Sequence, residues 1–246
     1  SANVLGAIQT TTFNNLSTGQ LQALNVTQLK ALTTSQVNGL SSTQIGNLTS
    51  TQIGGLNLSQ VNAVSSSFIQ NIGTSGLMAM NATLLGGLST SALQGLTTAQ
   101  AVALTSSSLQ ALSASQINAL TSTALQAIET ADTATLSKGQ IGSISSTQLN
   151  QLSTGQIRAL TDTQLKAIST SQVVGLSSTQ LGSLSSTQLR TLSTQQVQSL
   201  NLANLGTVQT ANLSSTQLQS LTTTQMGTVN SNLLSLGTAV FNALGS

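Results

Sequence analysis

From Ile144 to Leu200 the chain repeats one eight-residue unit and reads ISSTQLNQ, LSTGQIRA, LTDTQLKA, ISTSQVVG, LSSTQLGS, LSSTQLRT, LSTQQVQS and Leu200. Position 1 is aliphatic, position 2 is Ser or Thr, position 5 is Gln, position 6 is Ile, Leu or Val, and position 8 is usually small. Position 1 recurs every eight residues from Leu16 to Val208, and the array then skips three residues before Leu213. A fixed period is typical of a repeat protein, in which each unit contacts only its neighbours. We therefore predict one continuous array without an internal domain boundary, in which one extra residue would shift all later units out of register.

Each unit carries two signals for the start of a helix. The hydroxyl residue at position 2 and the Gln three residues later have the spacing of a capping box, in which each side chain bonds the backbone N–H of the other residue. Aliphatic residues at positions 1 and 6 flank this pair and have the spacing of a hydrophobic staple, as Leu184 and Leu189 do around Ser185 and Gln188. The unit therefore favours a short capped helix.

The helix cannot continue through successive units. Eight residues at 100° each overshoot two full turns by about 80°, so a continuous helix would spread the aliphatic residues around its surface. The chain must bend once per unit, and the small residue at position 8 suits a tight bend or close packing. Four of the five cationic side chains occupy position 7, which we expect to face solvent: Lys30, Arg158, Lys166 and Arg190. We predict an all-α solenoid of short capped helices whose positions 1 and 6 fill the core.

A β-solenoid is the alternative fold. The many Ser, Thr, Ile and Val residues favour strands, and stacked Gln side chains can form amide ladders. Against this fold, positions 1 and 6 would lie on opposite faces of a straight strand. A corner inside the unit would place both positions on the same face. Leu at position 1 and Ala at position 8 favour the helix.

The repeat pattern predicts three segments. Residues 1–15 are a lead-in or connector, residues 16–229 are the octapeptide array, and residues 230–246 are a C-terminal cap or connector that reads as an amphipathic helix. The ends of a solenoid must close or share the exposed end of the core. The candidate assembly residues at the two ends are apolar: Val4, Leu5, Phe13, Leu233, Leu234, Val240, Phe241 and Leu244.

Two parts of the array depart from the pattern. Between Phe68 and Ala92 the Gln of position 5 is replaced in successive units, which makes this part more apolar. In the unit 128–135, Glu129 takes the capping position and Asp132 takes the Gln position. This unit is read either as a notch for a cation or ligand or as a tolerated irregularity, and two carboxylates without a third ligand make a poor metal site.

The composition excludes most chemistry. The chain has no His, Cys, Tyr or Trp, so imidazole and thiolate catalysis and most metal sites are absent, and we predict no catalytic residue, cofactor or metal ion. Only 3% of the residues are charged and the net charge is +2, which argues against electrostatic binding of nucleic acid. No apolar stretch is long enough to span a membrane as a helix. An uncharged polar surface is poorly protected against self-association.

The pattern L-[ST]-[ST]-x-Q-[ILV]-x-[AG] occurs in Leu152–Ala159 and Leu160–Ala167. It resembles the octapeptide-repeat arrays of large secreted or surface-associated bacterial proteins. The resemblance covers most of the chain and implies an extracellular structural role, but it transfers no site residues. It leads us to expect a secreted, non-enzymatic subunit that binds copies of itself head to tail in a filament, sheath or biofilm matrix. The alternatives are a rigid adhesin or spacer arm that binds surface glycans, and an ice-binding protein.

Overall fold

The computed structural model describes residues 2–205 and 207–232 of the 246-residue chain. In this part the chain forms 28 α-helices and one 3-10 helix, and no strand occurs among these residues. The prediction of an all-α repeat array is therefore confirmed, and the β-solenoid is excluded for the described residues.

The chain forms two compact units, 1–128 and 129–246, which are described separately. The division is not visible in the repeat spacing, which continues unchanged from Leu120 through Ile128 to Leu136. It falls at the start of the unit 128–135, whose sequence departs most from the pattern.

The helices of the first unit follow one another at nearly constant intervals. Their bounds are α1 (Ala2–Ala7), α2 (Thr10–Phe13), α3 (Thr18–Gln22), α4 (Val26–Lys30), α5 (Thr34–Asn38), α6 (Ser42–Gly46), α7 (Ser50–Gly54), α8 (Leu58–Ala63), α9 (Ser66–Asn71), α10 (Gly73–Ala79), α11 (Ala82–Gly86), α12 (Thr90–Leu93), α13 (Thr98–Ala103), α14 (Ser106–Ala111), α15 (Ala114–Ala119) and α16 (Ser122–Ala127).

The second unit continues in the same way, with one short 3-10 helix, η1. Its helices are α17 (Thr130–Thr133), α18 (Lys138–Ser143), α19 (Ser146–Gln151), α20 (Thr154–Ala159), α21 (Asp162–Ala167), α22 (Thr170–Val174), α23 (Ser178–Ser183), α24 (Ser186–Thr191), α25 (Thr194–Ser199), η1 (Leu202–Asn204), α26 (Thr207–Ala211), α27 (Ser215–Gln219) and α28 (Thr223–Asn232).

The capping box predicted from the sequence is present in most units that carry Gln at position 5. In α24 the Ser185 hydroxyl accepts from the Gln188 backbone N–H at 3.2 Å, and the Gln188 Oε1 accepts from the Ser185 N–H at 3.0 Å. The box satisfies two of the backbone donors that a helix start leaves unpaired. The helix α24 ends at Thr191, position 8, and the next residue, Leu192, has extended backbone angles, so the chain bends once per unit.

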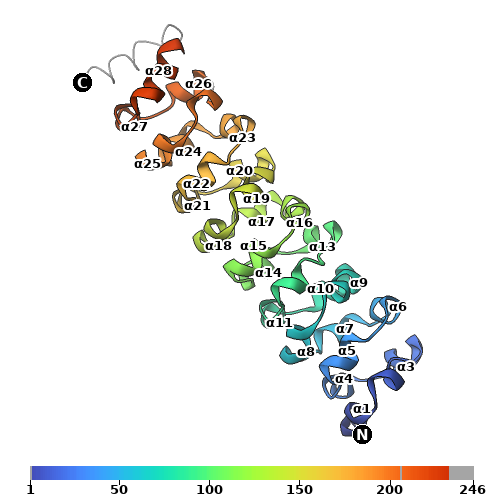
Figure 1. Cartoon of the computed structure of the whole chain (residues 1–246). Coiled ribbons are helices and arrows are strands. Elements are labelled where there is room, and N and C mark those ends of the chain that lie inside the picture. The colour runs from blue at the N-terminus through green and yellow to red at the C-terminus, as the bar shows by residue number, and fades with distance from the viewer. Residues whose placement is uncertain (1, 206, 233–246) are drawn as a thin grey trace. The chain divides into compact units, whose positions relative to one another are not determined.

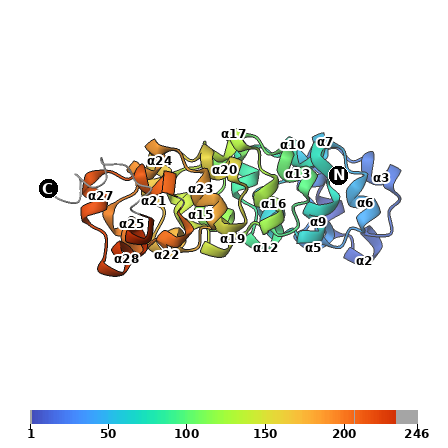
Figure 2. The same cartoon turned by 90° about the horizontal axis from the view of Figure 1, so that it is seen from above.

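Within each of the two compact units, most helices pack against the helix three places further along the chain. In the first unit one column runs α1, α4, α7, α10, α13, α16, a second runs α2, α5, α8, α11, α14, and a third runs α3, α6, α9, α12, α15. Figure 1 shows α3, α6 and α9 following one another along one side of this unit, and the turned view of Figure 2 shows α7 and α10 in the same way. In the second unit η1 takes a helix's place, because it contacts both α23 and α28. Three repeats, about 24 residues, therefore make one turn of the solenoid.

The core is built from positions 1 and 6, as the sequence predicts. The position-6 side chains of α7, α8 and α18, which are Ile53, Val61 and Ile141, are 0% exposed. Most position-1 residues are also buried, for example Leu120 and Ile144. The four position-7 cations are exposed, which confirms that this position faces solvent.

The middle of the array differs where Gly73 occupies the capping position. Its φ of +67° lies in the left-handed region that favours glycine, and the helix that begins there, α10, has no side-chain cap. The residues that replace Gln at position 5 nearby are buried, including Phe68 at 0% and Ala92 at 0% exposure. This part of the array is therefore more apolar inside, in agreement with the sequence.

The frame shift near the C-terminal end lies earlier than the sequence pattern predicts. Val208, which we expected at the buried position 1, is 67% exposed, whereas Leu205 is 3% exposed. The short unit is therefore 200–204, five residues long, and the eight-residue unit 205–212 lies between it and Leu213. A single 3-10 turn spans the short unit and still buries Leu202. The array tolerates this shorter unit, because the later units keep the same type of contact, as described below. The expectation for one extra residue stays a prediction.

Candidate functional site

The glutamine at position 5 joins successive turns of the solenoid. In α7 the Gln52 Oε1 accepts from the Thr49 N–H at 3.0 Å, which completes the capping box. Its Nε2 points the other way and donates to the backbone carbonyl oxygens of Leu21 at 2.8 Å and Leu24 at 2.9 Å. We call the set of bonds from position-5 Nε2 groups to carbonyls of the preceding turn the glutamine ladder.

The glutamine ladder has a nearly constant spacing, with partners 27 to 31 residues earlier before the five-residue unit. The carbonyl partners lie 31 and 28 residues earlier for Gln36, Gln60 and Gln196, at the position-6 and position-1 residues of earlier repeats. After the five-residue unit, Gln217 bonds Leu189 and Leu192, which lie 28 and 25 residues earlier. The three missing residues therefore change the spacing by three but leave the type of partner unchanged.

Side chains at position 7 add a second set of bonds between turns. The Gln22 Nε2 donates to the carbonyl of Asn47 at 2.7 Å, three repeats further along. In the second unit the Arg190 Nε donates to the carbonyl of Asn212 at 3.0 Å, and the Gln198 Nε2 donates to the carbonyl of Ser220 at 2.7 Å. The cation at position 190 therefore also caps the end of a helix in the next turn.

The first turn of the array presents glutamine donors that the described residues do not use. Gln20 is exposed and Gln28 is half-buried, whereas Gln36 in the next turn is 0% exposed. Both form capping boxes, with Ser17 N–H to Gln20 Oε1 at 2.8 Å and Asn25 N–H to Gln28 Oε1 at 2.9 Å. Among the described residues, neither Nε2 group bonds a backbone carbonyl.

The last glutamine of the sequence, in contrast, forms ladder bonds. The glutamine ladder ends at Gln225, whose Nε2 donates to the carbonyls of Val197 at 3.0 Å and Leu200 at 2.9 Å. No glutamine follows Gln225 in the sequence.

The structure separates the candidate assembly residues. Val4 is 61% exposed on α1 and Leu5 is half-buried, but Phe13 is 1% exposed and packs in the core of the first turn. The side chain of Phe13 therefore does not lie on the end surface. The five C-terminal candidates lie outside the described residues: Leu233, Leu234, Val240, Phe241 and Leu244.

The acidic unit 128–135 has an altered helix start. Glu129 occupies the N-cap of α17 without a side-chain cap bond, and Thr133 takes the buried position 6 at 2% exposure. The Thr133 hydroxyl donates to the Glu129 carbonyl at 3.2 Å, which satisfies this buried polar group locally. Among the described residues, no group of three or more His, Cys, Asp or Glu side chains could hold a metal ion.

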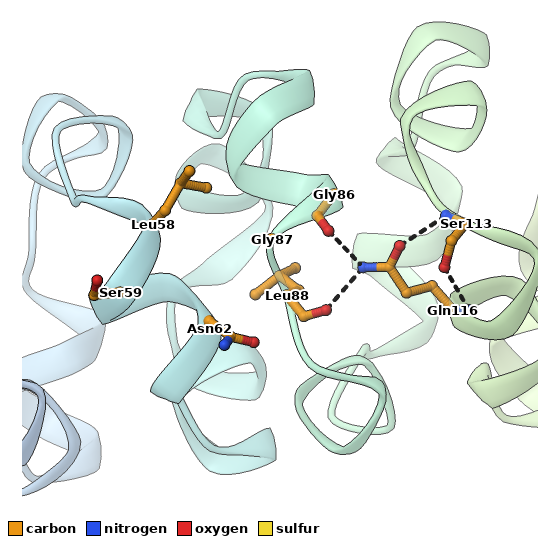
Figure 3. Close-up of a pocket in the computed structure, with 8 residues that line it drawn as sticks. All are labelled: Leu58, Ser59, Asn62, Gly86, Gly87, Leu88, Ser113 and Gln116. Carbon is orange, nitrogen blue, oxygen red and sulfur yellow. Dashed lines mark hydrogen bonds between the residues drawn. The ribbon is translucent and has the colours of Figure 1, made fainter.

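An open groove of about 520 Å³ lies in the first unit between α8, α11 and the start of α15. Leu58, at position 3 where most units carry a small polar residue, is 49% exposed on one side, and Gly86 and Gly87 leave the groove floor without side chains. Figure 3 shows the Gln116 amide bonded to the carbonyls of Gly86 and Leu88. The polar groups at its rim belong to Ser59, Asn62 and Ser113.

The sequence carries a signal for the glutamine ladder in its choice of residue at position 5. The capping box accounts for the acceptor oxygen at position 5, and Glu would serve equally well there. The chain never uses Glu at this position, since its one Glu is Glu129 at position 2. Gln combines an acceptor for the cap with a donor for the preceding turn, so the frequent use of Gln and the absence of Glu at this position are the available clue.

Comparison with known proteins supports the repeat architecture. The ALTTAQ repeat model matches residues 5–42, 13–50 and 125–162, which together cover less than half of the chain. The six letters of this name correspond to position 8 followed by positions 1–5, and Gly95–Gln100 reads GLTTAQ. No curated protein matches the chain. In the described residues no helix is long and apolar enough to cross a membrane. The chain is therefore similar to ALTTAQ repeat arrays.

Proposed function

We propose that the chain is a non-enzymatic structural protein that binds copies of itself head to tail, and that its assembly is an extracellular filament, sheath or matrix fibre. The observation that carries this proposal is the repeated turn-to-turn interface. Most turns present glutamine donors toward the preceding turn and backbone carbonyls toward the following one, as Gln36, Gln52 and Gln196 show. The same surface is thus complementary to itself after a shift of one turn.

This kind of interface is heterologous, because the donor face and the acceptor face differ. Heterologous contacts between copies produce an open assembly unless the rotation closes a ring. Low charge favours such assembly, since repulsion between like-charged copies is what usually keeps soluble proteins apart. The chain has five basic and three acidic residues in 246.

The extracellular, surface-associated and bacterial parts of the proposal rest on the resemblance to secreted octapeptide arrays. A surface of Ser, Thr, Asn and Gln suits a structural role in water, because it supplies many neutral hydrogen-bonding groups.

The first test is concentration-dependent light scattering with negative-stain electron microscopy of the purified full chain. We expect molecular mass to rise with concentration and fibres of uniform width to appear. A protein that remains monomeric at every concentration would contradict self-assembly. Detection in culture supernatant or on intact cells of the source, against a cytoplasmic marker, tests the location.

The second candidate function is a spacer or adhesin arm that binds surface glycans, with ice binding as a weaker variant of the same idea. The groove near Leu58 favours it, since hydroxyl and amide groups at the rim beside an apolar side chain can contact a sugar. Glycan-array binding that is lost in Asn62→Ala and kept in a variant away from the groove, without fibres, would favour this candidate. A lack of thermal hysteresis would remove ice binding.

A further inference from the structure

We propose that the first unit contains one compliant joint, at which the turn formed by α10, α11 and α12 tilts against the turn formed by α7, α8 and α9. We call the contact between these two turns the seam. The tilt narrows or widens the groove between α8 and α11. The joint is a property of the folded chain itself and does not depend on contacts between copies, so it goes beyond the proposed function.

The seam lies where the glutamine ladder is interrupted. Four successive units carry a residue without an amide at position 5: Phe68, Gly76, Leu84 and Ala92. Among the described residues, no hydrogen bond joins residues 66–95 to any residue before Ser65. In the turn before the seam, by contrast, Gln52 and Gln60 each bond carbonyls of the preceding turn. The seam is therefore held by apolar contacts alone.

Apolar contacts resist a small tilt less than ladder bonds do. A hydrogen bond weakens steeply when its length or angle changes, and breaking a ladder bond leaves a buried donor and its acceptors unpaired. The attraction between apolar surfaces is non-directional, and packed helices can slide past one another by small amounts. Small displacements between turns therefore cost least at the seam.

Two of the three helix columns act as the pivot of the joint. Between α7 and α10 the backbones approach closely, since a Cβ on Gly54 would lie 2.6 Å from the carbonyl oxygen of Ala79. Just after α12, a Cβ on Gly95 would overlap the backbone of Ser66 at the start of α9. Phe68, which fills the core between α9 and α12, is 0% exposed. These close contacts leave no room for the turns to approach further on either column.

The third column leaves room for movement. The groove of about 520 Å³ lies between α8 and α11, and Gly86 and Gly87 place no side chain in it (Figure 3). The end of the Leu58 side chain lies over Gly87, where a Cβ would be 2.8 Å away from it. Leu58 is 49% exposed, so it can rotate toward solvent when α11 moves. The tilt therefore has one open direction, in which α11 approaches α8 and the groove narrows.

Pulsed dipolar electron paramagnetic resonance tests the joint by measuring the distribution of distances between two spin labels. The chain has no Cys, so labels attach only at introduced cysteines. Ser35→Cys with Thr83→Cys labels α5 and α11 and spans the seam, whereas Thr147→Cys with Gln195→Cys labels α19 and α25 and spans two turns joined by ladder bonds. All four sites are exposed residues at position 4, and the members of each pair are 48 residues apart. Dilution with unlabelled chain restricts the signal to distances within one copy.

We expect the distance distribution across the seam to be about twofold wider than the distribution in the control pair, because only the seam permits sliding between turns without the loss of hydrogen bonds. Equal widths in the two pairs would overturn the joint.

Two matched substitutions test whether the ladder sets the width. Leu84→Gln adds an amide to α11, whose N-cap Asn81 already accepts from the backbone N–H of residue 84, so the new side chain can complete the capping box and bond the preceding turn. Gln172→Leu removes the amide that joins α22 to the turn before it. Far-UV circular dichroism melting checks that both variants remain folded.

We expect Leu84→Gln to narrow the distribution across the seam to the width of the control, and Gln172→Leu to widen the distribution in the control pair. Should Leu84→Gln not fold, Gln172→Leu decides the question alone. A control distribution that stays narrow in folded Gln172→Leu, or a seam distribution that stays wide in folded Leu84→Gln, would overturn the assignment of the joint to the missing ladder bonds.

Discussion

At the scale of single residues, the glutamine of position 5 is used at both ends of its amide group. The oxygen accepts from its own helix start and the nitrogen donates to the preceding turn, as in Gln52. An Asp or Glu supplies only acceptors and a Lys supplies only donors, so neither can replace it. A buried amide with all its bonds made also avoids the cost of desolvating a charge.

Replacing Gln52 by Glu is expected to destabilise the protein by at least about 2 kcal/mol at pH 7, because a carboxylate would face the carbonyls of Leu21 and Leu24 in a buried site. Gln20→Glu is the matched control, since Gln20 has the same capping box and an exposed amide. Urea denaturation followed by circular dichroism measures the difference. Equal effects of both substitutions would contradict the ladder's contribution to stability.

The effect of Gln52→Glu should also depend on pH. Burial and the two facing carbonyls raise the pKa of the new carboxyl group in the folded state above its unfolded value of about 4.3, because only the protonated form can donate. The variant is therefore least impaired below that unfolded pKa and loses stability as the pH rises through the folded pKa. We expect its deficit relative to wild type to be smaller at pH 4 than at pH 7, and a deficit that grows on acidification would contradict this reasoning.

Glycine at position 7 offers a second comparison at the residue scale. A Cβ on Gly54 would lie 2.6 Å from the backbone oxygen of Ala79 in the next turn, whereas a Cβ on Gly182 would meet nothing within 4 Å. We expect Gly54→Ala to lower stability by about 1–3 kcal/mol through overpacking, and Gly182→Ala to raise it by up to about 1 kcal/mol through helix propensity. Thermal midpoints measure both, and stabilisation by Gly54→Ala would show that the turns can separate without cost.

At the scale of the element, helices of four to seven residues are too short to be stable alone, because nucleation fixes several residues for few hydrogen bonds. Caps and packing must supply the stability. The helix α17, which has no side-chain cap, has four residues, whereas α10, which also has none, has seven, so packing can also hold a helix.

Removing one cap should therefore have a measurable effect. Ser185→Ala deletes the hydroxyl that accepts from the Gln188 N–H, and we expect a loss of about 1 kcal/mol. Ser186→Ala, one residue later on the exposed surface, should be within about 0.5 kcal/mol of wild type. Chemical denaturation of both variants compares them, and equal stabilities would mean that the cap is replaced by solvent at no cost.

Much of each element could be predicted from the sequence. The capping box, the staple and the buried positions 1 and 6 are local patterns that repeat, so each unit predicts the same helix independently. The position of the short unit could not be predicted in this way, because Val208 and Leu205 both fit an aliphatic position 1. Burial decides between them, with Val208 at 67% exposure and Leu205 at 3%.

At the scale of the molecule, the number of repeats per turn and the glutamine ladder are properties of non-local contacts. The spacing of 28 and 31 residues between ladder partners has no counterpart inside a single unit, which is why the repeat alone predicted a solenoid but not its turn. The same contacts explain why a five-residue unit is tolerated. Gln217 still reaches the position-6 and position-1 carbonyls of the preceding turn, so loss of three residues is absorbed by one 3-10 turn.

Because the array tolerates the short unit, we predict that a full eight-residue unit can replace it. Replacing residues 200–204 by the eight-residue sequence of 184–191, LSSTQLRT, would place a glutamine 31 and 28 residues after Val173 and Leu176. These carbonyls have no ladder bond in the present sequence, and Gln217 would keep its partners at the usual spacing. We expect an increase of about 1 kcal/mol in stability, seen as a higher thermal midpoint, since consensus substitutions commonly give gains of this size.

The control for the restored unit is the same eight-residue replacement with Leu in place of its Gln. It has the full unit length and the apolar positions but lacks the ladder bonds and half of the capping box. If unit length alone matters, both replacements will raise the midpoint equally. If the ladder stabilises the turn, only the glutamine version will do so, and slower amide hydrogen exchange in α22 and α23 will accompany it, because the new bonds hold these helices against the following turn. A lower midpoint in both versions would instead show that the five-residue unit is matched to its neighbours.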